Sequence, residues 1–156
     1  MKNLLKCSLI LLSLIPIVSA CDQLTLYHSY QSLSTKGWYK NDTVVFNIPI
    51  LDSIPTKLKA SVEVRSNAQY KYQDLYLIVS QNLQDSTIFK TDTIKLSFVD
   101  NKGKRITSGG EEFSISSCPI CTTITKNKGI RTFKFVHHMK GWRLQGINDI
   151  GIRLER

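Results

Sequence analysis

Apolar residues recur at every second position from residue 42 onward, and this period limits the folds open to the chain. Side chains along a strand point alternately to opposite faces, so the alternation predicts strands with one buried face and one face in water. It is clearest in residues 44–48, 57–65, 94–98 and 150–154. Residues 75–80 are apolar on both faces, which is typical of a strand at the centre of its sheet. Pro49 is expected to end the first of these strands, because proline has no N–H for the ladder.

Shorter apolar pairs predict further strands around Leu24–Tyr30, residues 113–115, residue 124 and residues 133–136. No window from 42 to 156 carries an apolar stripe at helical spacing. About eight or nine strands without helical crossovers predict an all-β protein, an antiparallel β-sandwich of jelly-roll-like type. A closed barrel is the alternative. The strands are too amphipathic toward water, and the chain too basic at a formal charge of +9, for a membrane barrel.

The N-terminus has the pattern of a secretion signal over residues 1–20: a basic head, a short apolar run and small residues before a cysteine. From residue 4 to residue 18 the apolar part covers about 22 Å as a helix, against a hydrocarbon core of about 30 Å. The segment Val18-Ser19-Ala20-Cys21 resembles the bacterial lipobox, in which the cysteine thiol receives a lipid and the chain is cut before it. We therefore expect Cys21 to open the mature protein and to carry a covalent lipid. An ordinary signal peptide with an incidental cysteine is the alternative.

The remaining chain is long enough for one domain with a real core. Residues 21–36 are predicted to form the lipidated N-terminus, a tether and a first strand, and residues 37–156 the β-sandwich domain. An exported protein of this charge meets no nucleic acid. Its anionic partners would be lipid phosphates, anionic glycans or the acidic face of another envelope protein. Because the lysines are spread along the chain, they are also consistent with a solvated surface that keeps the domain soluble.

The motif Cys118-Pro119-Ile120-Cys121 is the clearest candidate for chemistry. Its flanks are β-formers, so it lacks the helix N-terminus that lowers the pKa of a redox-active thiol. In an oxidising compartment we expect a disulfide between Cys118 and Cys121 that staples a turn, or two unpaired thiols. Redox catalysis and zinc binding are the alternatives. Zinc would lack ligands, because His137 and His138 are neighbours on a strand and only one of them could join the cysteines. No metal is expected, and no cofactor apart from the lipid on Cys21.

The sequence offers no catalytic constellation, since none of its three histidines lies in a recognised catalytic motif. Four aspartates, Asp42, Asp52, Asp92 and Asp100, stand in turn-like contexts and are interpreted as caps of backbone amides. Gly109-Gly110 is interpreted as a turn. No catalytic residue is therefore predicted, and the protein is not expected to be an enzyme.

Aromatic residues are the remaining candidates for recognition. Tyr70, Tyr72, Tyr76, Trp38 and Trp142 could form a platform for sugars, or pack in the core with their polar tips at the surface. From this set and its basic neighbours, the predicted ligand or partner surface consists of Arg65, Tyr70, Tyr72 and Trp142. Exposed, coplanar aromatics would favour sugar binding, and buried ones would argue against it.

Several short motifs follow one another in a characteristic order along the mature chain. They are Cys21-Asp22, Gly37-Trp38, Asp42-Thr43-Val44-x-Phe46, Arg65-x-Asn67-x-x-Tyr70-x-Tyr72, Asp92-Thr93-Ile94 and Leu144-x-Gly146-Ile147-x-Asp149-x-Gly151-Ile152. This ordered set resembles the gliding motility lipoprotein family GldH of the Bacteroidetes. The resemblance implies an envelope lipoprotein needed by the gliding machinery, which operates with the type IX secretion system, and a family that is not known to be enzymatic.

The expected function is that of a lipid-anchored assembly or stabilising factor that contacts the membrane through its lipid and other proteins of a gliding or secretion complex. A carbohydrate-binding lipoprotein is the alternative, with a glycan as ligand. The resemblance implies the outer membrane, although Asp22 after the lipidated cysteine would retain a lipoprotein in the inner membrane of enteric bacteria. We expect the periplasmic leaflet, because Gln23-Leu24-Thr25 lacks the acidic run of a surface-export tag.

Overall fold

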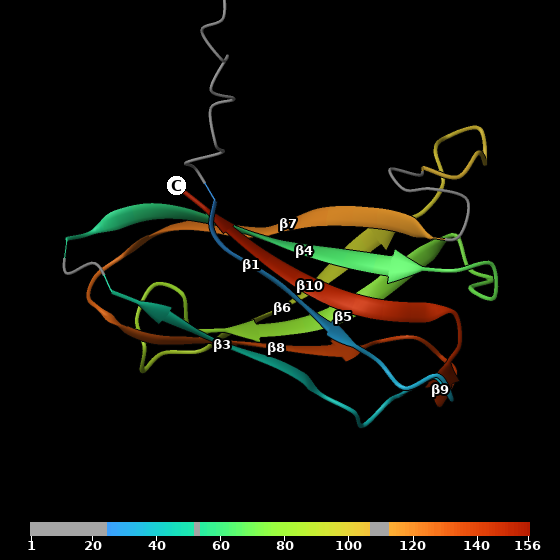
Figure 1. Cartoon of the computed structure of the whole chain (residues 1–156), viewed down its shortest axis with the longest axis horizontal. Helices are drawn as coiled ribbons and strands as arrows, with labels where there is room; N and C mark the ends of the chain where they lie inside the picture. The colour runs from blue at the N-terminus through green and yellow to red at the C-terminus, as the bar shows by residue number, and fades with distance from the viewer. Residues whose placement is uncertain (1–24, 52–53, 107–112) are drawn as a thin grey trace, which may run out of the picture.

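The computed structural model describes residues 25–51, 54–106 and 113–156, which fold as an all-β protein (Figure 1). The strands are β1 (Thr25–Ser32), β2 (Trp38–Tyr39), β3 (Val44–Ile50), β4 (Thr56–Ser66), β5 (Asp74–Gln81), β6 (Lys90–Ser97), β7 (Ser114–Thr125), β8 (Gly129–His137), β9 (Arg143–Leu144) and β10 (Ile147–Glu155). Sheet A has the order β1-β10-β4-β7, sheet B has the order β3-β8-β5-β6, and β2 pairs with β9 in a two-stranded ribbon. The predicted antiparallel β-sandwich is confirmed.

Strand pairing in this sandwich is nested. The hairpin β5–β6 is innermost, and the antiparallel pairs β4–β7, β3–β8, β2–β9 and β1–β10 follow around it in turn. The chain is thus one long hairpin, rolled so that successive pairs fall in different sheets, which is the jelly-roll arrangement. Its outermost pair brings Thr25 opposite Glu155.

Alternating apolar side chains from both sheets fill the space between them, as the period of two predicts. The fully buried set includes Phe46, Leu58, Val62, Leu75, Leu77, Phe133, Phe135, Ile150, Ile152 and Leu154. Each side chain of this size contributes about 1.5–3 kcal/mol when it is removed from water. Trp38 and Tyr70 belong to the same core and close it near the β2–β9 ribbon.

The prediction that Pro49 ends a strand is wrong. Strand β3 continues to Ile50, and Pro49 lies opposite Ile130 of β8. Because β3 is an edge strand with β8 on one side only, a proline can take the position at which its missing N–H would have faced away from the sheet.

The alternation in β4 predicts an outer face of sheet A that is open to water. The structure shows that part of this face is covered. Glu63 points to this face but is only 7% exposed. The Tyr30 ring lies across β10 at Gly151, where an added Cβ would come within 2.6 Å of the ring atom Cε1. Beyond Gly151, the Tyr30 hydroxyl donates a hydrogen bond to Glu63, so a side chain from β1 reaches β4 across the intervening strand. The Arg65 guanidinium covers the ring from 3.8 Å.

This crossing predicts a specific coupling between Gly151 and Tyr30. Gly151→Ala should displace the ring and destabilise the fold by about 1–3 kcal/mol, the usual cost of overpacking. In a Tyr30→Ala background the added methyl group has room, so the same substitution should be nearly neutral. Denaturant unfolding of the two single variants and the double variant measures the coupling. Strictly additive effects would show that the ring does not rest on Gly151.

Candidate binding surface

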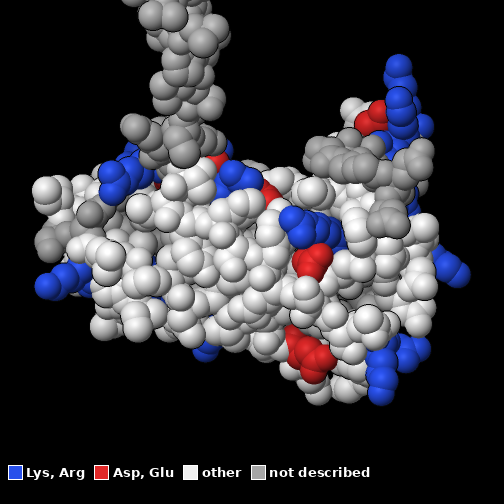
Figure 2. Space-filling model, viewed as in Figure 1, with Lys and Arg blue, Asp and Glu red and all other residues white. Residues whose placement is uncertain are grey.

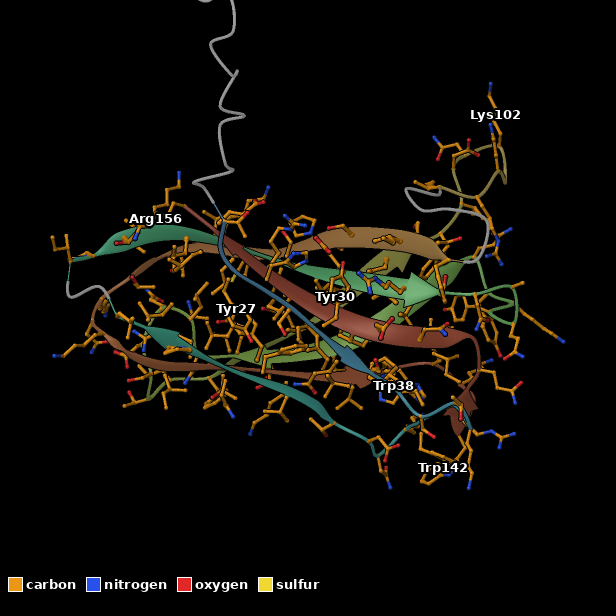
Figure 3. The ribbon with its side chains drawn as sticks, viewed as in Figure 1. Tyr27, Tyr30, Trp38, Lys102, Trp142 and Arg156 are labelled. Atoms are coloured by element: carbon orange, nitrogen blue, oxygen red, sulfur yellow. The ribbon has the colours of Figure 1, made fainter. Side chains whose placement is uncertain are left out.

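The strand directions give the sandwich two different ends. Strand β1 begins and β10 stops at one end, here called the N-terminal end. The β2–β9 ribbon and the loops 33–37, 67–73 and 138–142 lie at the other, here called the β9 end. In Figure 3, Trp142 and Lys102 lie toward the β9 end and Arg156 toward the N-terminal end. Figure 2 shows basic side chains in small groups at both ends of the visible face and between them, consistent with the spread of lysines in the sequence.

The β9 end is held together by close backbone contacts. The Asn67 N–H donates to the Gly146 carbonyl at 2.9 Å, and the Trp38 indole donates to the Asp42 carbonyl at 2.8 Å. Gly146 has a φ of +82°, and a Cβ there would lie 2.1 Å from the backbone N of Tyr70. Only glycine fits both the conformation and the contact. The β4–β5 loop is therefore fixed against the β9–β10 connection.

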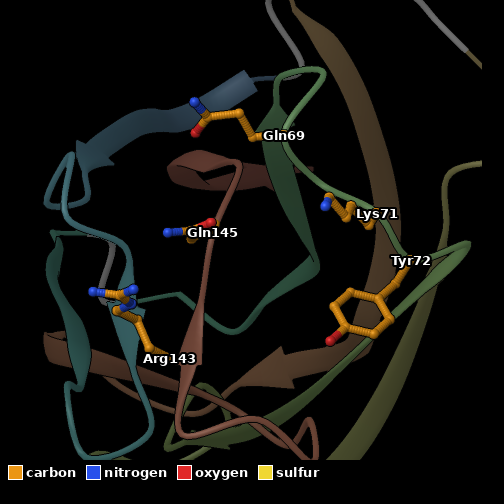
Figure 4. A pocket seen from close by; sticks show the side chains of 5 residues that line it. All are labelled: Gln69, Lys71, Tyr72, Arg143 and Gln145. Carbon is orange, nitrogen blue, oxygen red and sulfur yellow. The ribbon is translucent and has the colours of Figure 1, made fainter.

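Between these two segments lies a hollow of about 260 Å³, the β9 pocket (Figure 4). It is lined by Gln69, Lys71 and Tyr72 from the β4–β5 loop, by Arg143 from β9 and by Gln145 from the β9–β10 connection. Tyr72 is 53% exposed. Two cations, two amides and a phenol line the pocket, and no carboxylate does. This set of hydrogen-bond donors suits an acidic group on a partner.

A second pocket, of about 560 Å³, lies around Trp142, the residue before Arg143. We call it the Trp142 pocket. Its lining consists of Lys40, Asn41, Ile78, Val136, His137, His138, Lys140 and Trp142. The side chain of Trp142 is 61% exposed.

The structure does not bring the four predicted surface residues together. Tyr72 and Trp142 line the two pockets of the β9 end. Tyr70 is 1% exposed, donates its hydroxyl to the Asp74 carbonyl, and has its pKa raised by burial. Arg65 lies on the outer face of sheet A, 3.9 Å from an Asp149 carboxylate oxygen. Of these four residues, the β9 end therefore offers only Tyr72 and Trp142 as exposed aromatics.

The Cys118–Cys121 motif lies inside β7 rather than in a turn, so the prediction of a stapled turn is wrong. The register along β4 shifts between Ala60 and Ser61, which leaves Ile120 as the extra residue of a β-bulge. Cys118 therefore lies opposite Val62 and Cys121 opposite Ala60, both on the core side of the strand. Both thiols are free, and burial raises the pKa of each. A disulfide between them stays a prediction.

Metal ligands do not gather in the described part of the chain, where no group of three or more His, Cys, Asp or Glu side chains could hold an ion. His137 packs edge-on against Trp38 in the core, and burial lowers its pKa. His138 follows directly after β8 and is exposed, whereas His137 is buried.

The aspartates divide by position. Asp42 accepts a hydrogen bond from the Tyr39 N–H, and Asp100 from the N–H groups of Lys102 and Lys104, as predicted for turn caps. Asp92 lies within β6, so its assignment to a turn is wrong. Asp52, Gly109 and Gly110 fall outside the described residues, as does Cys21.

No pattern in the sequence indicated the cluster of polar side chains that surrounds Glu63. His28, from β1, lies 3.0 Å from one of its carboxylate oxygens, and Arg153, from β10, donates to the other at 2.7 Å. Burial would raise the pKa of Glu63, but the hydrogen bonds from Tyr30, Arg153 and His28 outweigh it, and the pKa is lowered. Burial and the neighbouring carboxylate raise the pKa of Tyr30 to about 12. Both groups thus keep their ordinary charge states near neutral pH, which indicates a structural ion pair.

Comparison with known proteins identifies the family. A family model described as GldH lipoprotein matches residues 25–154, which is most of the chain. The chain belongs to the GldH lipoprotein family. It is 28% identical to the gliding motility lipoprotein GldH of Flavobacterium johnsoniae, over 97% of this chain and 98% of that protein. The resemblance predicted from the ordered motifs is confirmed. Along the described residues, no helix has the length and apolarity needed to cross a membrane.

Three of the motifs that carry the GldH resemblance meet in space. Trp38 of the Gly37-Trp38 motif pairs with Leu144 of the last motif, and Asn67 and Tyr70 of the Arg65–Tyr72 motif contact Gly146. These residues are far apart in the sequence, but all of them build the β9 end. Residues of these three motifs therefore form part of the frame of the β9 end.

The Glu63 cluster predicts how stability depends on pH. Since the folded pKa of Glu63 lies below its ordinary value of 4.5, its stabilisation is complete above about pH 4.5 and is lost as pH falls through the folded pKa. Glu63→Gln should cost about 1.5–3 kcal/mol at pH 7, because it weakens the charge-assisted hydrogen bonds from Tyr30, His28 and Arg153. The variant should also lose less stability than the native chain between pH 5 and 3. Urea midpoints measured across that range test this, and parallel curves would rule out Glu63 as a source of the acid sensitivity.

Proposed function

We propose that this member of the GldH family is a non-enzymatic assembly or stabilising factor of a gliding or secretion complex, anchored by a lipid on Cys21. In this proposal its β9 end docks an acidic face of another envelope protein. The observation that carries the proposal is the β9 pocket, which Lys71 and Arg143 line from two different segments together with the exposed Tyr72, and whose lining contains no carboxylate.

The position of the pocket relative to the anchor supports this role. Cys21 precedes Thr25, the first residue of β1, by four positions. At about 3.3 Å per residue, β1 runs about 26 Å from there toward the β9 end. A lipid on Cys21 would leave the N-terminal end near the membrane and present the β9 end to soluble domains of partners. We assign the anchor to the periplasmic leaflet of the outer membrane.

The chemistry of the candidate reactive groups favours a role without catalysis. His28, Tyr30 and Arg153 all contact the Glu63 carboxylate directly, as expected of a structural cluster. The raised pKa values of Cys118 and Cys121 keep both thiols protonated, whereas a nucleophilic or redox-active cysteine needs its thiolate.

Charge reversal in the β9 pocket tests the docking surface. Lys71→Glu with Arg143→Glu should abolish recovery of the gliding or secretion components that co-purify with the native protein from its own membranes, as measured by quantitative mass spectrometry. Both side chains are exposed, so folding should be unaffected. The matched control is Lys57→Glu with Lys128→Glu, which makes the same charge change at exposed positions toward the N-terminal end. Equal loss in both variants would indicate a general charge effect and would contradict a docking role for the β9 pocket.

Removal of the anchor tests the other half of the proposal. Cys21→Ala should leave the domain folded but release it from the membrane, or stall it as an uncleaved precursor, because two acyl chains are what make such an anchor stable. Complementation should then fall to the level of a deletion. Cys118→Ser with Cys121→Ser, expressed at the same level, should fractionate and complement normally. Full complementation by the Cys21 variant together with failure of the double variant would overturn the anchor and place the activity at the thiols.

A further inference from the structure

The Trp142 pocket is separate from the docking surface proposed above. Trp142 and Arg143 are consecutive residues, yet Arg143 lines the β9 pocket and Trp142 the other. The floor of the Trp142 pocket is formed by Ile78 of β5 and Val136 of β8, which are paired across sheet B. These residues alternate with core-facing neighbours, so the pocket lies against the outer face of that sheet.

The wall of this pocket is held in place by backbone contacts. The Lys40 N–H donates to the Trp142 carbonyl at 2.9 Å, and the His138 N–H donates to the Tyr76 carbonyl at 2.7 Å. Between them, Met139 packs against the core. The indole of Trp142 is thus presented from a fixed backbone, although a ring of this size is normally buried.

The charge of the lining is one-sided. Lys40 and Lys140 both line the pocket, together with the amide of Asn41 and the imidazole of His138, and the lining contains no carboxylate. Neither lysine forms an ion pair with a described residue. The nearby Asp42 carboxylate is directed to the Tyr39 N–H in the β2–β3 turn.

We propose that the Trp142 pocket binds an anionic sugar, a pyranose that carries a carboxylate or a phosphate. The exposed indole and the Ile78–Val136 floor match the apolar face of a sugar ring. The two lysines match its charge, and Asn41 and His138 can hydrogen-bond its hydroxyl groups. A volume of about 560 Å³ falls within the range of roughly 300–1,000 Å³ that is usual for small-molecule sites.

Other ligand classes use only part of this lining. An inorganic anion would engage the lysines and leave the indole unused, and a neutral sugar would engage the indole and leave two cations uncompensated. The proposal is independent of the docking function, since it rests on residues of a different pocket.

The experiment is a titration of the full-length protein in detergent with three sugars: tri-galacturonate, glucose 6-phosphate and neutral galactotriose. Tryptophan fluorescence reports the site, because the only other tryptophan, Trp38, is buried in the core. One or both anionic sugars should bind, and which one does identifies the source of the negative charge. Galactotriose and inorganic phosphate should bind at least about tenfold more weakly, the loss expected for about 1.4 kcal/mol.

Variants locate the binding, now followed by calorimetry. Trp142→Ala should weaken it about tenfold, as expected for one aromatic contact. Lys40→Ala with Lys140→Ala should weaken it similarly and remove most of its salt dependence. Two control variants alter only the β9 pocket and should bind the sugar normally. They are the single variant Tyr72→Ala and the double variant Lys71→Glu with Arg143→Glu. The proposal is overturned if neither anionic sugar binds, if galactotriose or phosphate binds equally well, or if Trp142→Ala has no effect.

Discussion

Pairing of the two ends of the chain, β1 with β10, is the constraint on which the rest of this molecule depends. It is the outermost pair of the nested hairpin, and it joins residues more than a hundred positions apart in the sequence. This pairing also determines where the two pockets of the β9 end lie. With β1 and β10 aligned, the short β2–β9 ribbon must form where both strands leave the sheet, and the connections that build the two pockets follow from it.

Side chains reinforce this outer pair beyond its backbone ladder. Tyr30 and His28 of β1 both reach Glu63 on β4, and Arg153 of β10 joins the same carboxylate. An edge strand such as β1 would otherwise be bound by one neighbour only. The absence of a side chain at Gly151 lets the Tyr30 ring span three strands. The first strand of the domain is therefore attached to two strands of the sheet instead of one.

The sequence was informative where one physical signal dominated. Alternation in residues 44–48, 57–65 and 150–154 predicted strands and their buried faces, since burial on one side imposes a period of two. It could not foresee that β4 carries a buried carboxylate on its outer face, because the partners of Glu63 come from strands at the two ends of the chain. Pro49 and the bulge at Ile120 escaped prediction for a related reason. Their placement depends on which strand lies at an edge and how two strands align, and neither is a local property. The two pockets likewise arise from loops that only the nested pairing brings together.

The direction of β1 has a mechanical consequence. Hydrogen bonds of an antiparallel ladder run perpendicular to its strands. Tension between the start of β1 and the β9 end would act along the strand, so it would load every bond between β1 and β10 in shear at the same time. Tension between Thr25 and Glu155, which pair at one end of the ladder, would instead peel β1 from β10 one pair of bonds after another. The same ladder thus resists tension from Thr25 toward the β9 end better than tension that separates Thr25 from Glu155.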